Sequence, residues 1–485
     1  QKCALLSGET VFTTRALPGK GIPAITLSDG PNGVRKQAGA ADHLGLNPSV
    51  PATCFPTSSA TACSWDEKLG EAVGEALGEE AAAQEVAVLL GPGLNIQRSP
   101  LCGRDFEYFS EDPILAGRMA AAYVRGIQKN GISACPKHFA VNSQELRRMA
   151  SDSVLDERTL RELYLTGFEI VVKEAKPKTI MTSYNLINGT YANENAHLLQ
   201  DILRKDWGFD GAVVTDWGGS NDHALGVKNG STLEMPCPGG DSIRELMKAV
   251  QDGKISEADV DARLDEMLEL VLSTHAAVEK APRTFDAAAH HKLARRAAAE
   301  SIVLLRNEGG ILPLRPNEKL AVIGDFAETP RYQGAGSSAV NALQVDTLLD
   351  CIKADDSGIT LVGYASGFER QGAADAEKLE EAVALAKKAD TVLLCLGLDE
   401  LRESEGLDRS DMKLAENQQQ LLAAVAAVNP NVVVLLSAGA PVETPWAGQC
   451  RALVYGALGG QAGAGAAADI LTGRLCPCGK LSQTW

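Results

Sequence analysis

The sequence predicts an α/β protein in which a (β/α)8-like TIM barrel is followed by a doubly wound α/β sandwich domain. Two observations indicate this fold: short apolar runs end repeatedly on polar or glycine residues, and helical patterns lie between the runs. Parallel strands covered on both faces show such continuous apolar runs and alternate with helices. In barrel enzymes, the side chains at the carboxyl ends of the strands carry the chemistry.

The first half of the chain contains the strand patterns of the barrel. The clearest is the run 211–214, which ends on Thr215, Asp216 and Trp217. An amphipathic pattern over 156–174 predicts one of the intervening helices. We therefore expect the barrel, with the catalytic nucleophile, over residues 1–282. The other expected strands have the same form and cover residues 24–27, 88–90, 132–135, 179–181 and 232–233.

A break near Pro282 separates the second half of the chain, and residues 283–300 form a linker and leading helix that we expect to reach 301–305. Strand patterns then alternate with helical ones, which predicts a doubly wound domain over 301–485. A nucleotide-binding interpretation is disfavoured because the glycine-rich segment 459–468 does not open the first βα unit. The strand patterns cover 320–323, 391–396, 432–436 and 452–455, and the helical ones 374–388, 414–428 and 461–471.

Charge and hydropathy restrict the partners. A net charge of −17, from 63 acidic and 46 basic side chains, argues against a nucleic-acid partner, because such proteins usually carry a basic stripe. The sequence contains no uninterrupted apolar run of about 18 residues, so we expect no membrane span. A small neutral or cationic ligand is favoured, and homo-oligomerisation is left open.

The 11 cysteines are scattered, and Cys135 and Cys395 lie inside apolar runs, where reduced thiols pack as small hydrophobes. This favours a reducing, cytoplasmic compartment. Secretion or a periplasmic location stays open because the sequence does not begin with Met. Cys476 and Cys478 are one residue apart and no histidines cluster with them, so we expect no metal site and no cofactor.

Several chemically active side chains follow the expected barrel strands and should converge at one mouth. Each also has a purely structural interpretation, such as a helix N-cap for an aspartate, a structural Lys-His pair, or wall packing for the tyrosine and methionine. A nearby lysine would keep a carboxylate ionised, as a nucleophile requires. These side chains are Asp29, Lys137, His138, Met181, Tyr184 and Asp216.

Arg104 lies in a segment, 103–112, in which charged residues alternate with aromatic ones. Such a mixture suits a saccharide, whose hydroxyl groups need bidentate donors and acceptors and whose C–H faces need rings. The alternative is a buried ion pair between Arg104 and Glu107. We favour the sugar.

A second carboxylate is expected from the other domain, in the charged, glycine-containing loop 403–409 that follows the strand pattern 391–396. Taken alone, this loop could be a solvated surface loop. If it reaches over the barrel mouth, Glu405 pairs with Asp216 at the cleft between the domains, which is a usual location for ligand sites.

At this point the motifs match a known family: the chain closely resembles glycoside hydrolase family 3, of the β-glucosidase type. No one motif is specific, but together they are. A short segment, 139–145, follows Lys137-His138, where phosphorylase-like and N-acetylglucosaminidase relatives carry a longer glycine-rich loop. The matching segments are 27–31, 103–113, 137–139, 181–185, 215–217, 233–236, 334–338 and 405–409.

The resemblance implies that Asp216 is the nucleophile and Glu405 the general acid/base, with Glu403 as a competitor for the second role. Trp217 would wall the subsite of the non-reducing terminal sugar, and we add Met181 to that wall. The residues implied to hold the sugar are Asp29, Arg104, Lys137, His138, Arg148 and Tyr184.

The expected reaction is the release of terminal β-D-glucose from oligosaccharides or glucosides with retention of configuration. Retention requires the two carboxyl groups to lie about 5–5.5 Å apart. It also requires Asp216 ionised and Glu405 protonated at the start, so their environments should separate the two pKa values. The alternatives are a β-xylosidase or α-L-arabinofuranosidase of the same family, or a catalytically inactive sugar-binding homologue.

One departure from the family pattern concerns length. In three-domain members the segment equivalent to 479–484 is followed by more α/β chain and a fibronectin-III-like module, whereas this sequence ends at Trp485. We expect either a short member or a fragment. The aglycone, the linkage preference and the oligomeric state do not follow from the sequence.

Overall fold

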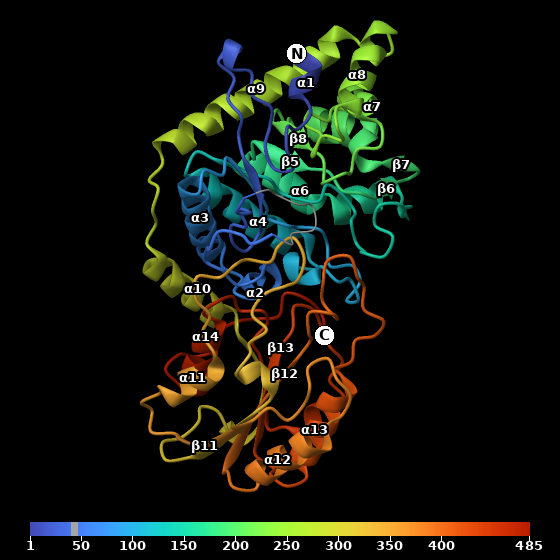
Figure 1. Ribbon diagram of the computed structural model, residues 1–485. Coiled ribbons are helices and arrows are strands. Elements are labelled where there is room, and N and C mark those ends of the chain that lie inside the picture. The colour runs from blue at the N-terminus through green and yellow to red at the C-terminus, as the bar shows by residue number, and fades with distance from the viewer. Residues whose placement is uncertain (40–46) are drawn as a thin grey trace.

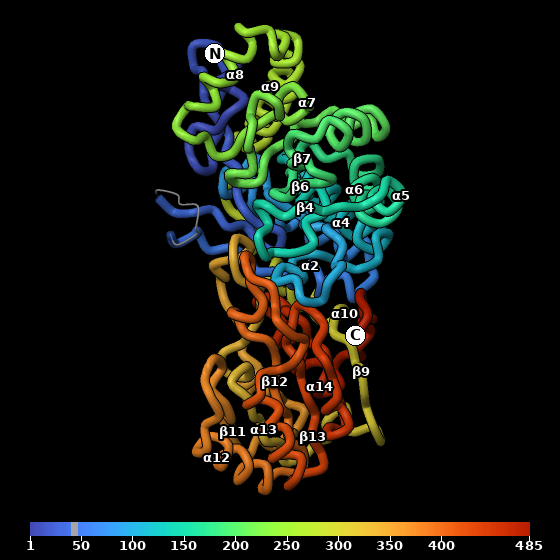
Figure 2. The backbone as a smooth tube through the Cα atoms, turned by 90° about the vertical axis from the view of Figure 1, so that its right-hand side faces the viewer, coloured from blue at the N-terminus to red at the C-terminus, as the bar shows by residue number. Residues whose placement is uncertain are grey.

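The protein is described by a computed structural model that covers residues 1–39 and 47–485. Two domains lie one above the other in both views of the chain (Figures 1 and 2). Each domain has its own cluster of buried apolar side chains. The N-terminus lies at the far end of the first domain, whereas the C-terminus lies near the junction (Figure 1).

The first domain is built on short parallel strands whose residues are almost all buried. They are β1 (Leu27–Asp29), β2 (Val88–Leu90), β3 (Ser133–Ala134), β5 (Thr179–Met181) and β8 (Ala212–Val214). β2 pairs with both β1 and β3, and β5 pairs with β8. Parallel bridges continue this wall, at Phe139 with Thr182 and at Val214 with Leu233. The parallel wall is the α/β arrangement that the sequence predicts for this domain.

The helices of the first domain begin where the local sequence supplies caps. The side chain of Asp66 accepts hydrogen bonds at the start of α3, Asp112 does so before Pro113 at the start of α4, and Ser256 forms a capping box at the start of α9. These helices are α1 (Lys2–Leu5), α2 (Ser58–Ala62), α3 (Glu67–Ala83), α4 (Pro113–Gln128), α5 (Glu157–Thr159), α6 (Thr166–Ile170), α7 (His223–Asn229), α8 (Asp241–Gln251) and α9 (Glu257–Lys280).

Two details complete the first domain. The helix predicted over 156–174 is an almost continuous helical stretch, in which α5 and α6 alternate with the π-helical segments Leu160–Tyr164 and Val171–Ala175. A small sheet lies beside the wall and consists of β4 (Asp152–Ser153), β6 (Leu186–Ile187) and β7 (Thr190–Tyr191).

The second domain contains one mixed sheet with strand order β11-β10-β12-β13-β14-β9. All neighbouring strands are parallel except β14 and β9. α11 and α14 pack against each other, as do α12 and α13 (Figure 1). The elements are β9 (Val303–Asn307), β10 (Lys319–Ile323), β11 (Thr360–Ala365), β12 (Thr391–Gly397), β13 (Val432–Ser437), β14 (Ala452–Tyr455), α11 (Leu348–Lys353), α12 (Ala376–Ala386), α13 (Glu416–Ala426) and α14 (Gly463–Leu471).

The sequence-based assignment is wrong at two strands of this sheet. The leading helix, α10 (Ala287–Ser301), ends before the 301–305 run, most of which belongs to β9. A short apolar run does not distinguish helix from strand, and here pairing with β14 decides. β11 was not predicted, because this edge strand is only partly buried and lacks a continuous apolar run.

The predicted boundary near Pro282 falls between α9 and α10. Ala294 and Ala297 of α10 join the apolar cluster of the first domain, whereas Ala298 and Ala299 join that of the second. Because α10 contacts both cores, we propose 1–282 and 301–485 as the two domains, with 283–300 between them.

Candidate active site

A cavity at the domain junction brings together all ten residues that the sequence nominated for catalysis or substrate binding. Its volume is about 120 Å³. Phe12 and Ser337 also line it, and neither was nominated from the sequence. The ten nominated residues are Asp29, Arg104, Lys137, His138, Arg148, Met181, Tyr184, Asp216 and Trp217 from the first domain, and Glu405 from the second domain.

Asp216 is the second residue after β8, whose three residues are fully buried. Its Oδ1 accepts a hydrogen bond from the backbone N–H of Trp217 at 2.8 Å. Its Oδ2 lies 3.6 Å from Nε2 of His138 and has no hydrogen-bond partner among the described residues. Burial raises the pKa of Asp216, while Arg104 and Arg148 oppose that rise. One carboxylate oxygen is thus fixed and the other is available to a ligand.

A buried ion cluster supports the floor of the cavity. The carboxylate of Glu107 accepts a hydrogen bond from Nε of Arg104 and forms an ion pair with its Nη2, both at 2.7 Å, and lies 3.1 Å from Nζ of Lys137. The ion pair between Arg104 and Glu107 that was an alternative to a substrate role is therefore present, and Arg104 lines the cavity as well. Burial raises the pKa of Asp29 to about 6, against the opposing charge of Lys137.

His138 is held on both sides. The Asn95 side-chain amide accepts from the backbone N–H of His138 at 2.8 Å and donates to its carbonyl at 2.9 Å. The ring Nδ1 lies 3.0 Å from the hydroxyl of Tyr108. Burial, together with the charges of Arg104 and Lys137, lowers the pKa of His138 well below its usual range. The imidazole is therefore neutral near pH 7 and presents Nε2 toward Asp216.

Aromatic rings form one wall of the cavity. Nε1 of Trp217 donates to the carbonyl of Val11 at 2.7 Å, and the ring of Phe12 lies 5.3 Å from that of Trp217. The hydroxyl of Tyr184 donates to the carbonyl of Trp217 at 2.9 Å, and the guanidinium of Arg148 lies 4.9 Å from the centre of the Tyr184 ring. The sequence pattern did not indicate that Phe12 belongs to the site, because its segment forms neither a strand nor a helix.

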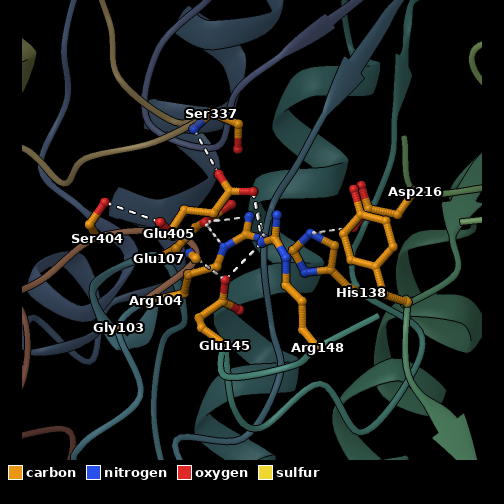
Figure 3. A network of polar contacts seen from close by, with 12 residues as sticks. Gly103, Arg104, Glu107, His138, Glu145, Arg148, Asp216, Ser337, Ser404 and Glu405 are labelled. Carbon is orange, nitrogen blue, oxygen red and sulfur yellow. Dashed lines mark hydrogen bonds and ion pairs between the residues drawn. The ribbon is translucent and has the colours of Figure 1, made fainter. Parts of the chain in front are cut away.

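Glu405 enters the cavity from the loop between β12 and α13 (Figure 3). Its Oε2 accepts from the backbone N–H of Ser337 at 2.7 Å. Its Oε1 accepts from Nη1 of Arg148 at 2.8 Å and lies 3.5 Å from Nη1 of Arg104. Gly336, with φ of +115°, allows this approach, because a Cβ there would lie 2.4 Å from Cβ of Glu405.

The structure also separates the two competing glutamates. Glu403 is 1% exposed, lies outside the lining of the cavity, and accepts from the backbone N–H of Gly439 at 2.9 and 3.0 Å. Only Glu405 reaches the space in front of Asp216. The separation of 5–5.5 Å between the carboxyl groups of Asp216 and Glu405 stays a prediction.

The surroundings of Glu405 in this structure favour the carboxylate rather than the protonated form expected at the start of the reaction. Burial alone would raise the pKa of Glu405, but Arg104, Arg148 and the hydrogen bonds of Ser337 outweigh it and hold the pKa far below its usual range. Glu405 is thus ionised here, whereas a general acid must carry a proton. The sequence could not indicate this, because the guanidinium groups come from the other domain.

Hydrogen bonds to Asp408, which we call the Asp408 clamp, fix the Glu405 loop on the first domain. The carboxylate of Asp408 accepts from the backbone N–H groups of Gly103 at 3.1 Å, Glu145 at 3.0 Å and Leu146 at 2.9 Å. Gly103 is required by the close contact, since a Cβ there would lie 1.6 Å from the carbonyl oxygen of Leu407. The sequence singled out neither Glu145 nor Asp408 for a role, although both lie close to nominated residues.

Among residues 1–39 and 47–485, no three His, Cys, Asp or Glu side chains are grouped so as to hold a metal ion. All eleven cysteines are free, and Cys476 and Cys478 are exposed. None of the helices in the described part of the chain is both long and apolar enough to cross a bilayer.

Comparison with known proteins assigns the family. Residues 38–270 match the Glycosyl hydrolase family 3 N terminal domain, and residues 302–485 match the Glycosyl hydrolase family 3 C-terminal domain. These two matches cover both domains of the structure.

Three known proteins are similar to the chain over its whole length. The whole chain is 46% identical to the thermostable beta-glucosidase B of Acetivibrio thermocellus and 44% identical to an exo-alpha-(1->6)-L-arabinopyranosidase of Bifidobacterium longum, and spans 64% and 65% of their lengths. It superposes on beta-glucosidase 3B of Thermotoga neapolitana, solved in complex with alpha-D-glucose, with a TM-score of 0.90 and 33% identity, and covers 74% of that chain. The chain therefore belongs to glycosyl hydrolase family 3.

Proposed function

We propose that the protein is a retaining, exo-acting β-glucosidase that releases non-reducing terminal β-D-glucose from oligosaccharides or glucosides. The observation that carries the proposal is the pairing, in one cavity, of Asp216 from a barrel strand with Glu405 from a loop of the second domain. The β-glucosidase among the relatives and the glucose complex of the Thermotoga neapolitana enzyme support the choice of sugar.

In the first step, the free oxygen of Asp216 attacks the anomeric carbon while Glu405 donates a proton to the glycosidic oxygen. The bond between C1 and the leaving oxygen breaks, and a covalent glycosyl-aspartate forms. In the second step Glu405, now a carboxylate, takes a proton from water as the water attacks C1. Two displacements restore the original anomeric configuration, and the Asp216 carboxylate is regenerated.

The other polar side chains of the cavity suit the hydroxyl groups of a pyranose. Lys137 and Arg104 offer fixed donors, Asp29 offers carboxylate acceptors, and the neutral His138 presents one ring nitrogen. The rings of Phe12 and Trp217 offer an apolar wall for the C–H face of the sugar. These groups would hold the terminal sugar while C1 lies next to Asp216.

The identity of one relative favours a second candidate sugar. The Bifidobacterium longum relative is an exo-alpha-(1->6)-L-arabinopyranosidase, and a pentopyranose lacks the exocyclic C6 hydroxymethyl group of glucose. A panel of p-nitrophenyl β-D-glucoside, β-D-xyloside, α-L-arabinopyranoside and α-L-arabinofuranoside separates these activities. We expect the highest kcat/KM for the β-D-glucoside, and a preference for a pentoside would replace the sugar while leaving the mechanism intact.

The test of the mechanism is covalent trapping with an activated 2-deoxy-2-fluoro-β-D-glucoside, followed by peptide mapping. We expect time-dependent inactivation and one labelled peptide, modified at Asp216. Label on another residue would refute the nucleophile assignment. Binding of glucose without trapping or turnover would indicate an inactive sugar-binding homologue instead.

A further inference from the structure

The proposed reaction poses a problem of charge at Glu405. A general acid must be protonated when the substrate is bound, yet Glu405 lies 2.8 Å from one guanidinium, 3.5 Å from another, and 2.7 Å from a backbone N–H donor. All three neighbours favour the carboxylate. Substrate binding must therefore separate at least one cation from Glu405 before the proton can be held.

The two arginines differ in their freedom to move. The Arg104 side chain is 1% exposed and is fixed to Glu107 by a hydrogen bond from Nε and an ion pair from Nη2, at 2.7 Å each. The Arg148 side chain is 20% exposed, and its Nη1 bridges two carboxylates, at 2.8 Å from Glu405 and 2.7 Å from Glu145. Arg148 is the cation that can leave Glu405, because its side chain is more exposed than that of Arg104 and Glu145 can still hold it after the move.

Glu145 is built to receive Arg148. It is 3% exposed, and its Oε2 accepts both from Nη1 of Arg148 and from the backbone N–H of Gly406 at 2.8 Å. Gly406 follows Glu405 in the chain, so the same carboxylate oxygen contacts the cation and the loop that carries the acid. Figure 3 shows Glu145 below the guanidinium groups, on the side away from Ser337.

We propose that Glu145 is a positioning residue that retains Arg148 when a bound sugar separates Arg148 from Glu405, so that Glu405 takes up the proton it donates. The inference rests on the proposed glycosidase function. The proton comes from solvent, passes from Glu405 to the leaving oxygen, and no covalent bond is made to Glu145 or Arg148. Throughout, the contact with Gly406 keeps the acid in place.

The other charged groups around Glu405 do not take the role that we propose for Arg148 and Glu145. Lys137 is committed to Glu107. The ionised forms of Asp29 and Asp216 oppose ionisation of Glu405, and among the described residues neither forms an ion pair with Arg148. The hydroxyl of Tyr184 is neutral, because burial raises its pKa well above the usual range. Among the described residues, the titratable and charged groups that share the cavity or the ion network of Glu405 are Asp29, Arg104, Glu107, Lys137, His138, Glu145, Arg148, Tyr184 and Asp216.

The first test uses the unaltered protein. Calorimetric titration with phenyl 1-thio-β-D-glucoside, in buffers of different ionisation enthalpy, measures the protons taken up on binding. We expect net uptake approaching one proton per site at pH 6–7. Binding without proton uptake would overturn the inference.

The second test compares pH profiles of kcat for phenyl β-D-glucoside, because kcat reports the groups of the enzyme–substrate complex. In Glu145→Gln, Arg148 keeps Glu405 as its carboxylate partner, so we expect the alkaline limb to move by about one pH unit or more to lower pH. Proton uptake on thioglucoside binding should fall, and Glu145→Asp should restore part of both. A variant that lowers activity equally at all pH values, with an unmoved limb, would show that Glu145 only holds the loop.

A double-mutant cycle separates the action through Arg148 from the simple loss of a nearby charge. In an Arg148→Met background, Glu145→Gln should move the alkaline limb of the pH profile little further. A shift of this limb equal to that in the unaltered background would show that Glu145 does not act through Arg148, and it would refute the inference. Thermal unfolding of each variant checks that it is folded. If the unaltered protein hydrolyses no glycoside, the proposed function fails; turnover with an unmoved Glu145→Gln limb refutes only this inference.

Discussion

The two carboxylates of the cavity reach it by different structural routes. Asp216 is the second residue after the buried parallel strand β8, and its position is set by that strand and by a hydrogen bond to its neighbour in sequence. Glu405 lies on a loop of the second domain, and its position is set by contacts to Ser337, Arg148 and the Asp408 clamp. The first placement is local, and the second depends on the docking of two domains.

This difference predicts different responses to perturbation. A change at the strand end should act on the nucleophile alone. A change at the domain contact should displace the acid/base while the nucleophile stays in place.

The largest effect is expected at the nucleophile. Asp216→Ala should lower kcat for every glycoside by about 10⁴-fold or more, because no other described carboxylate has a free oxygen beside His138. The measurement is steady-state hydrolysis of p-nitrophenyl β-D-glucoside. Asp222→Asn is the matched control, since Asp222 caps α7 outside the cavity and Asn caps nearly as well. Full activity of Asp216→Ala would remove the nucleophile assignment.

The acid/base should show a leaving-group signature. Glu405→Ala should lower kcat/KM by about 10²–10⁴-fold for poor leaving groups, but much less for 2,4-dinitrophenyl β-D-glucoside, which needs no protonation. Azide should rescue turnover and give a β-glucosyl azide. Glu403→Gln is the comparison, because Glu403 faces Gly439 rather than the cavity. Azide rescue in the Glu403 variant alone would transfer the role to that residue.

The domain contact can be tested without altering either carboxylate. Gly103→Ala puts a Cβ where the carbonyl oxygen of Leu407 now lies, so the Glu405 loop must move. We expect about 10²-fold slower hydrolysis of substrates with poor leaving groups, as a displacement of about 1 Å can cause. Trapping by an activated 2-fluoro glucoside should change far less. Gly448→Ala, where a Cβ meets nothing within 4 Å, is the control.

The smallest effect concerns α10, which joins the domains. Burial alone would lower the pKa of His290, but Glu80, at 2.7 Å, and Glu79 outweigh it and raise the pKa. A raised pKa in the folded state stabilises the protein below the unfolded value of about 6.5, and this contribution is lost as the pH rises through the folded pKa.

His290→Gln should therefore destabilise the protein more at pH 5.5 than at pH 8.5. Urea unfolding at both pH values measures the difference, and catalysis at neutral pH should stay near that of the unaltered protein. A destabilisation equal at both pH values would show that His290 contributes packing alone.

Most of the site residues that belong to the first domain could be predicted from the sequence. Apolar runs that end on Asp29, Lys137, Tyr184 and Asp216 indicate parallel strands, and the carboxyl ends of such strands share one edge. The sequence did not indicate Phe12, because no regular element carries it, nor β11, because an edge strand is only partly buried. It also placed the 301–305 run in a helix, where pairing with β14 makes most of it a strand.

The family motifs, the alternation of strands and helices, and the residue types that line the cavity follow from the sequence alone. The contact between the domains establishes which glutamate of the 403–409 loop lines the cavity with Asp216, and it places Glu405 between Arg104 and Arg148, which favour the ionised carboxylate. The two kinds of information differ in the distance along the chain over which they act. Strand periodicity is a local property of the chain, whereas the charge of a buried carboxylate depends on cations that lie more than two hundred residues away in sequence and within 4 Å in space.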